Sequence, residues 1–367
     1  MDPTQAFCPN RDCPARGQVG KGNLSVHSRK ERRFLCQQCG KTFAERTGTS
    51  FSRLRTPTET VTLVVTLLAH GCPVQAIVAA FGFDERTVAN WLDRAGVHCR
   101  AVHEHLVETP RRLGQVQADA LRVKMQGAIA WMAMAVMLTT RLWRGGEVSL
   151  HRDLCLIRRL MQRVRRCALA GRLLICTDGL CSYVRAAREA FRDHVATGRR
   201  GRQPLRVWGR LLIAQGVKRY DNRRVIEVER RVVHGRADQA EKARAASSGE
   251  GVINTASIER LNGTFRERLA SLARRTRGLV RTVTRVEAGM WLVGTVYNFC
   301  TPHASLREMA GKAVRDRTPA MAAGITRRRW SVRELLLYHV PPPRWTPPKK
   351  RGRRSREMVA LIEQWCQ

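Results

Sequence analysis

Apolar residues recur along this chain with two periods, one of two residues and one of three to four. The short period predicts β-strands and the longer one predicts α-helices. Strand-like alternation fills residues 113–125, and we expect two antiparallel strands next, joined by a hairpin turn at Arg144-Gly145-Gly146. The two hairpin strands are predicted at residues 128–142 and 147–150. Further strands are predicted at residues 172–176, 207–213 and 225–233, and helices at residues 154–169, 183–191 and 256–275.

Two stretches inside this region, residues 193–206 and 236–250, are polar and basic and show no clear period. We expect them to be loops. Strands mixed with helices over residues 112–305 indicate one α/β domain.

Residues 56–100 have a purely helical pattern. Asp84 is a natural N-cap, and Gly96 is a natural C-terminal stop for the helix that follows it. Two short helices joined by a tight turn are typical of a helix-turn-helix unit, whose second helix enters the major groove of DNA. Glu85, Arg86 and Asn90 would then face the base edges. The alternative is a small helical packing unit that makes no contact with DNA.

Residues 1–52 contain two pairs of cysteines, Cys8 with Cys13 and Cys36 with Cys39. Short spacings let two sulfurs reach one ion from a tight turn, and two such turns complete the tetrahedral site of a structural zinc ion. A segment of about 50 residues with few aliphatic side chains hardly folds without such an ion. His27 is a competing ligand, and four unconnected thiols are the alternative.

The charge of the chain points to a polyanionic partner. Among 367 residues, 67 are Lys or Arg and 30 are Asp or Glu, so the net charge is +37. Such an excess argues against an ordinary metabolic enzyme and favours a partner that carries phosphates. An apolar fraction of 43% is enough for buried cores. The most apolar stretch, residues 128–138, is too short for the roughly 20 residues of a membrane helix.

The two ends of the chain add little. No secretory signal is visible at the N-terminus, so we expect a cytoplasmic protein whose cysteines are thiols or metal ligands. Residues 306–367 form a Pro-containing tail with a basic run at residues 349–354. That run either grips a phosphate backbone or is a solvated linker.

Candidate chemistry lies among the acidic residues. Asp119 lies on a predicted central strand, and Asp178 follows the next buried strand. Carboxylates in such a crevice repel each other unless a cation such as Mg²⁺ joins them. Glu259 on the helix of residues 256–275 is a third candidate ligand. A capping or turn role for each Asp, and a solvated position for the Glu, are the alternatives; competitors by composition are Glu147, Asp153, Asp221 and Glu287.

One face of the helix of residues 256–275 groups further polar residues with Glu259. Asn262 and Arg266 follow it at helical spacing, and Gly263 between them would let a DNA strand approach. Arg266, and then Arg274 and Arg275, would hold that strand. Two metal ions clamped by carboxylates suit in-line phosphoryl transfer.

Four segments together resemble a known family. They are Thr177-Asp178-Gly179, the run from Asn254 to Arg268 with its core Ile-Glu-Arg-Leu-Asn-Gly-Thr-Phe-Arg, the following Arg-Arg-Thr, and the run from Tyr297 to Leu306. These segments are similar to those of the DDE transposases of bacterial insertion sequences, in the branch that opens with a zinc ribbon. The resemblance covers about residues 8–305.

The resemblance implies an RNase H-like catalytic domain, a mixed five-stranded sheet with helices, after a zinc ribbon and a helix-turn-helix unit. It implies an Asp-Asp-Glu triad that binds Mg²⁺ or Mn²⁺, matched here by Asp119, Asp178 and Glu259. It further implies double-stranded DNA as partner, both element ends and target, at least a homodimer, and a place on the bacterial nucleoid.

This chain departs from the family pattern in two places. Ala120 stands where relatives often have a second acidic residue, and 81 residues separate Asp178 from Glu259. We interpret His303 as a packing or DNA-contact residue rather than a metal ligand. The functional alternatives are a non-catalytic DNA-binding regulator, such as a decayed copy, and a nuclease without strand transfer.

Overall fold

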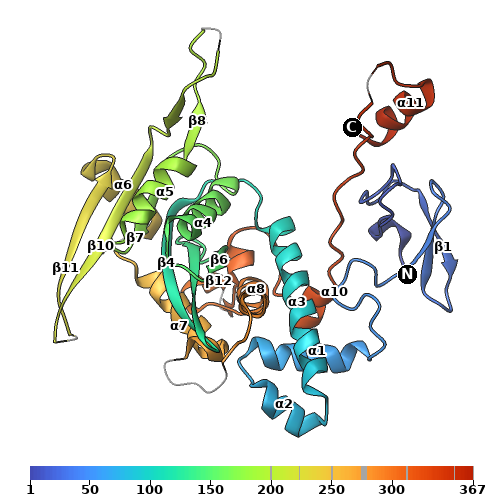
Figure 1. Ribbon diagram of the computed structural model, residues 1–367, viewed down its shortest axis with the longest axis horizontal. Helices are drawn as coiled ribbons and strands as arrows, with labels where there is room; N and C mark the ends of the chain where they lie inside the picture. The colour runs from blue at the N-terminus through green and yellow to red at the C-terminus, as the bar shows by residue number, and fades with distance from the viewer. Residues whose placement is uncertain are drawn as a thin grey trace. The chain divides into compact units, whose positions relative to one another are not determined.

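The chain forms two compact units, each described by itself below (Figure 1). The first comprises Met1–Val61 and Leu336–Gln367, and the second comprises Thr62–Leu335. Arg274 and Arg275 lie outside the described residues, as does Arg351 of the basic run. The computed structural model describes residues 1–198, 201–222, 224–248, 251–273, 279–310, 313–350 and 352–366.

The first unit is built on a small antiparallel sheet in the order β1-β2-β3. Both ends of the chain contribute to this unit, so residues 336–367 do not stand apart as a tail. The reason is Trp365, which is buried among the cysteines near the N-terminus. Its elements are η1 (Pro3–Gln5), β1 (Leu24–Ser28), β2 (Arg33–Cys36), β3 (Thr42–Ala44) and α11 (Arg356–Trp365).

A six-stranded mixed sheet forms the centre of the second unit, in the order β11-β10-β7-β4-β5-β6. This confirms the predicted α/β class. β4 and β10 run parallel to β7 on either side of it, and the remaining neighbours pair antiparallel. The strands are β4 (Gly114–Met125), β5 (Ala128–Met137), β6 (Trp143–Ser149), β7 (Leu173–Thr177), β10 (Leu211–Asp221) and β11 (Arg224–His234).

Helices cover both faces of this sheet (Figure 1). α4 (Leu154–Arg166) and α5 (Cys181–Ala190) lie on one face; α6 (Ala237–Ser248) and α7 (Ala256–Arg268) lie on the other. Alanines of α6 pack on apolar side chains of β7 and β10. The strands of the centre are therefore buried on both faces, which explains their nearly continuous apolar runs.

Three helices precede the sheet in the chain, and the third of them packs on α8 (Val283–Cys300), which in turn packs on β6. They are α1 (Thr58–Ala69), α2 (Val74–Phe81) and α3 (Glu85–Leu106). The predicted cap is confirmed, because the Asp84 carboxylate accepts hydrogen bonds from the backbone N–H groups of Arg86 and Thr87. The predicted stop at Gly96 is wrong. A Cβ there would lie 2.4 Å from the Ala288 Cα, so the glycine serves close helix packing instead.

The predicted hairpin turn at residues 144–146 is also wrong. The chain turns at residues 138–142, where Arg141 has a φ of 56°. Gly145 and Gly146 lie inside β6, where a Cβ would lie 2.7 Å from Arg163 Cδ and from Met290 Sδ, respectively. Close packing of β6 against neighbouring helices thus requires these glycines.

Both predicted loops contain regular structure. β8 (Arg192–His194) pairs with β9 (Leu205–Val207), and α6 occupies most of residues 236–250. Alanine-rich α6 buries only a narrow stripe, so its apolar period is weak. α7 ends at Arg268, earlier than predicted, and is followed by η2 (Ala270–Leu272).

The remaining elements lie after α8 and are short: η3 (Ala304–Leu306), β12 (Glu308–Ala310), β13 (Ala313–Arg315), α9 (Pro319–Ala322) and α10 (Val332–Leu337). Within the described ranges, no helix combines the length and the apolar character needed to cross a membrane.

Candidate metal centre and carboxylate site

The four N-terminal cysteines form one cluster. Their sulfurs all lie within 4.8 Å of one another. The Cys8 and Cys39 sulfurs are 3.7 Å apart, and those of Cys13 and Cys36 are 3.8 Å apart. A tetrahedron with metal–sulfur bonds of 2.3 Å has edges of about 3.8 Å, whereas a disulfide bond measures about 2.05 Å. The predicted grouping is confirmed, and the cluster could bind a metal such as zinc.

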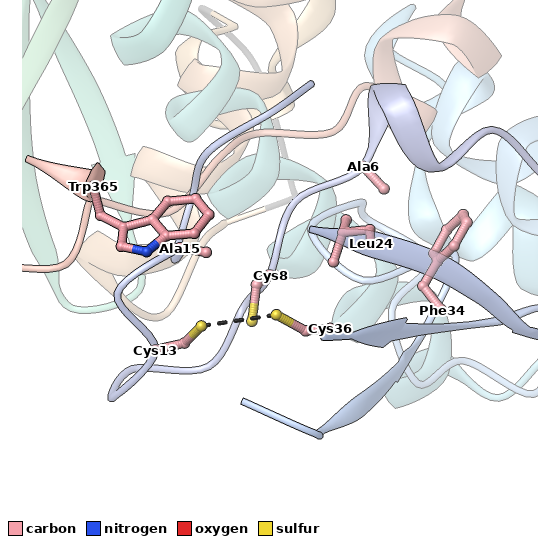
Figure 2. Close-up of a cluster of buried hydrophobic side chains, with 8 residues drawn as sticks. All are labelled: Ala6, Cys8, Cys13, Ala15, Leu24, Phe34, Cys36 and Trp365. Atoms are coloured by element: carbon pink, nitrogen blue, oxygen red, sulfur yellow. Dashed lines mark hydrogen bonds between the residues drawn. The ribbon is translucent and has the colours of Figure 1, made fainter. Parts of the chain in front are cut away.

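Tight turns bring the two pairs together. Gly40 has a φ of 66°, and its N–H donates to the Cys36 carbonyl at 2.8 Å, which closes the turn between Cys36 and Cys39. On the other side, the Gly17 N–H donates to the Cys8 carbonyl at 3.0 Å. The sulfurs of Cys8, Cys13 and Cys36 point toward one another from these turns (Figure 2).

The environment of the thiols differs from one to the next. Burial raises the pKa of Cys8 to about 12 and also raises that of Cys13. Burial acts in the same direction on Cys39, but hydrogen bonds from the Lys41 backbone, Asn10 and neighbouring thiols outweigh it and lower its pKa to about 7. A thiolate ligand must lose its proton, so metal binding here releases protons and weakens as the pH falls.

Apolar side chains enclose the cluster. Leu24 and Phe34 of the sheet lie on one side, and Trp365 of α11 lies on the other (Figure 2). The Gln18 amide donates to the Trp365 carbonyl at 2.6 Å and fixes the end of α11. The C-terminal helix thus supplies part of the small core around the cysteines.

Asp119 and Asp178 lie next to each other in the second unit. Gln117 on β4 is paired in register with Cys176 on the parallel strand β7, so Asp119 and Asp178 lie level, two residues further along. Burial raises the pKa of Asp119 above its ordinary value, and the negative charge of Asp178 raises it further. The repulsion expected between the two carboxylates is therefore present in the fold.

α7 is anchored directly to this part of β4. The Gln117 side chain accepts hydrogen bonds from the Ser257 and Ile258 backbone N–H groups at 2.9 and 3.0 Å. Its amide nitrogen donates to the Asn254 carbonyl at 2.9 Å. One turn further on, the Asn262 amide donates to the Asp119 carboxylate at 2.7 Å. The helix that carries Glu259 is thus tied to the strand that carries Asp119.

Basic side chains of this chain neutralise the other two carboxylates. Arg152 donates to Asp178 at 2.7 Å, and Lys218 donates to Glu259 at 2.7 Å. Burial raises the pKa of Glu259, but the hydrogen bonds from Lys218 and Thr255 outweigh it and lower the pKa overall. Across the described residues, the group of metal-ligating side chains within 4.8 Å of one another is the cysteine cluster, and the three carboxylates do not form a second one.

The competing acidic residues have other roles. Glu147 accepts from Arg163 at 2.9 Å, and Asp153 caps α4 by accepting from the Leu156 N–H. Asp221 ends β10, and Glu287 is half-buried on α8 near Arg100. None of these four is among the main groups that shift the pKa of Asp119.

The residues predicted to contact DNA divide into two groups. Glu85, Arg86 and Asn90 are exposed on the N-terminal half of α3, and Arg266 is exposed on α7. Asn262 differs from the prediction of a DNA-facing side chain, because it is 1% exposed and binds Asp119.

Three residues at the carboxylate site were missed by sequence reasoning, namely Gln117, Arg152 and Lys218. Gln117 lies two residues before Asp119, and strand alternation places both on one face. That signal was available. Lys218 lies on β10 beyond the predicted end of its strand at residue 213, and Arg152 lies in an irregular stretch before α4, so no pattern pointed to either.

Comparison with known proteins does not assign this chain to a family. No protein-family model matches the sequence, and a search of curated proteins found no similar chain.

Proposed function

We propose that this protein is a DDE-type DNA transposase that cleaves and joins DNA at the ends of a mobile element. One observation carries the proposal. Asp119 on β4 lies beside Asp178, which directly follows the adjacent parallel strand β7. Asn262 and Gln117 tie the Glu259 helix to β4. The net charge of +37 supports a nucleic-acid substrate.

The strand order supports an RNase H-like catalytic domain. Without β11, the sheet is a mixed five-stranded sheet of the kind that this fold has. β11 and α6 both fall in the long interval between Asp178 and Glu259. The interval is therefore occupied by added structure, and the Glu helix still packs beside β4.

The donor chemistry at this site fits a hard divalent ion. Carboxylate oxygens are the ligands that Mg²⁺ and Mn²⁺ prefer. Burial, and after it the negative charge of Asp178, raises the pKa of Asp119, and a bound cation would offset both effects. The positively charged side chains of Arg152 and Lys218 bind Asp178 and Glu259 where a metal ion would otherwise bind. Bound metal ions would activate the attacking oxygen and stabilise the leaving oxygen.

The reaction then has two phosphoryl transfers. In the first, the oxygen of water bonds to phosphorus at the element end, and the bond to the 3′ oxygen breaks to leave a 3′-OH. In the second, that 3′-OH attacks a target phosphodiester, and the target 3′ oxygen leaves. Asp119, Asp178 and Glu259 would hold the ions, and the exposed Arg266 would bind a phosphate of the reacting strand.

We further propose that the first unit is a zinc ribbon and that α2 and α3 form a helix-turn-helix. The sulfur spacing of the cysteine cluster fits Zn²⁺. The exposed Glu85, Arg86 and Asn90 would read base edges of the terminal repeats. Because two element ends must be joined in one complex, we expect at least a dimer.

The test is nicking and strand transfer on DNA that contains the element ends, in the presence of Mg²⁺. Asp178→Asn should abolish both activities while leaving DNA binding intact. Asp221→Asn is the matched control, because Asp221 lies at the end of β10 and not beside Asp119. Equal activity of the Asp178 variant and the wild type would refute the site. Sequence-specific binding by the wild type without cleavage would favour a DNA-binding regulator instead.

A further inference from the structure

A basic pocket lies on the opposite side of α7 from Glu259. Its volume is about 430 Å³, and it is bounded by α7, the end of α8 and the turn that follows β5. Ser257, Arg260 and Thr264 line it from α7, at the three- and four-residue spacing that places side chains on one helix face. Glu259 and Arg266 project from the other side of the same helix.

Hydrogen bonds hold the polar groups of this pocket in place. The Arg141 guanidinium donates to the Ser257 hydroxyl and, through Nε, to the Ser305 hydroxyl at 3.4 Å. The Tyr297 hydroxyl donates to the Arg141 carbonyl at 3.1 Å. Arg141 is therefore fixed on one wall by partners from three separate segments of the chain.

His303 is fixed on the same wall. Its Nδ1 accepts from the Ser305 backbone N–H at 3.3 Å, so the proton of the neutral ring lies on Nε2. Burial lowers the pKa of His303, and the charges of Arg141 and Arg260 lower it further, so the ring is neutral near pH 7. His303 thus adds an N–H donor to the pocket without adding a charge.

The pocket carries an excess of positive charge. Arg141, Arg260 and Arg268 line it, against the single carboxylate of Glu267. The Arg268 guanidinium donates to the Thr301 hydroxyl at 3.4 Å. The Arg260 guanidinium, which is exposed, makes no hydrogen bond or ion pair with any other residue that the structure describes. A fixed set of donors with one free guanidinium is the arrangement that binds an oxyanion.

We propose that this pocket binds a phosphate group of a nucleic-acid strand. Arg260 and Arg141 provide the charged donors, and His303 provides a neutral one. The pocket is separate from the three carboxylates, so a strand held here would cross α7 to reach them. The identity of the strand rests on the proposed function, but the affinity of the pocket for phosphate does not.

Titration of the full-length protein with inorganic phosphate, followed by calorimetry at low ionic strength, tests the pocket directly. Arg260→Ala should weaken phosphate binding roughly tenfold, the loss expected for one charge-assisted hydrogen bond. Arg260→Lys should recover part of the affinity because it keeps the charge. The matched control is Arg172→Ala, since Arg172 is exposed ahead of β7 and does not line the pocket. Equal effects of the two alanine variants would overturn the proposal.

Oligonucleotides identify the source of the phosphate. We expect Arg260→Ala to weaken binding of single strands with a 5′-phosphate and with a 5′-hydroxyl alike, which assigns the pocket to the phosphodiester backbone. Weakening confined to the 5′-phosphorylated strand would assign it to a strand end and still support the proposal. If Arg260→Ala weakened the binding of inorganic phosphate but of neither oligonucleotide, the assignment to nucleic acid would be overturned.

These measurements separate the pocket from the catalytic proposal. Asp178→Asn should leave phosphate affinity unchanged, because Asp178 does not line the pocket. If the wild type has no strand-transfer activity but Arg260→Ala still loses phosphate affinity, the proposed function fails and the phosphate site stands. If Asp178→Asn loses strand transfer but Arg260→Ala binds phosphate normally, the pocket proposal fails alone.

Discussion

Replacing Gln117 by leucine tests how the carboxylate site is assembled. The Gln117 side chain is 1% exposed and holds the first turn of α7 with hydrogen bonds to three backbone groups, including the N–H groups of Ser257 and Ile258. Leucine has a similar volume, so the substitution removes the hydrogen bonds with little change in packing. The buried Ile258 N–H and the part-buried Ser257 N–H then lose their acceptor.

The magnitude follows from the number of lost partners. A buried donor without an acceptor costs roughly 1–3 kcal/mol, so losing the acceptor of one buried and one part-buried N–H costs about 2 kcal/mol. We expect the free energy of opening the first turn of α7 to fall by this amount, which makes local hydrogen exchange roughly thirtyfold faster. Glu259 lies in this same first turn, so its position should become less defined and the nicking rate should fall.

Hydrogen–deuterium exchange of the peptide that covers residues 254–268 measures the opening, and metal-dependent nicking measures its effect. Gln117→Glu keeps the acceptor but loses the donor, so its effect should be smaller. Gln75→Leu is the matched control because Gln75 is exposed on α2. Unchanged exchange in Gln117→Leu would refute the idea that this side chain anchors α7.

Four further outcomes are expected. Metal analysis should find about one zinc ion per chain, lost in Cys36→Ser but retained in Cys155→Ser, since Cys155 is exposed and outside the cluster. Gly96→Ala should lower the free energy of unfolding by about 1–3 kcal/mol, because its Cβ would lie 2.4 Å from the α8 backbone. Gly263 has open space around it, so Gly263→Ala should raise that free energy by up to about 1 kcal/mol. Denaturant melts measure the free energy of unfolding of both glycine variants. The raised pKa of Asp119 means that its carboxylate takes up a proton at a higher pH than an ordinary Asp does, and that proton competes with a metal ion. Mn²⁺ affinity, measured by calorimetry, should therefore begin to fall at a pH at which an ordinary Asp is still ionised. A Mn²⁺ affinity that falls only at the pH at which an ordinary Asp takes up a proton would contradict the raised pKa.

Local patterns were enough to predict some features of the fold and the sites. Cysteine spacing predicted the cluster, and strand alternation followed by an apolar run placed Asp119 on one strand and Asp178 directly after the neighbouring one. The Asp84 cap was equally readable, because a cap acts on the residues that directly follow it. Each of these features depends on neighbours in the sequence.

Features that depend on distant partners could not be predicted in the same way. A glycine marks either a helix end or a close contact, and only the presence of α8 shows which applies at Gly96. Trp365 completes the core around cysteines more than 300 residues earlier, as its contact with Gln18 at a separation of 347 residues illustrates. Lys218 reaches Glu259 from a strand whose length is set by pairing with β11.

A metal-specificity switch at Asp178 tests the central claim most directly. Cysteine in place of Asp178 offers a softer sulfur ligand, which Mg²⁺ binds poorly and Mn²⁺ accepts more readily. Strand transfer by Asp178→Cys should therefore be lost in Mg²⁺ and partly restored in Mn²⁺, while the wild type works in both. If Asp178→Cys were as active as the wild type in Mg²⁺, Asp178 would not be a ligand of the catalytic metal.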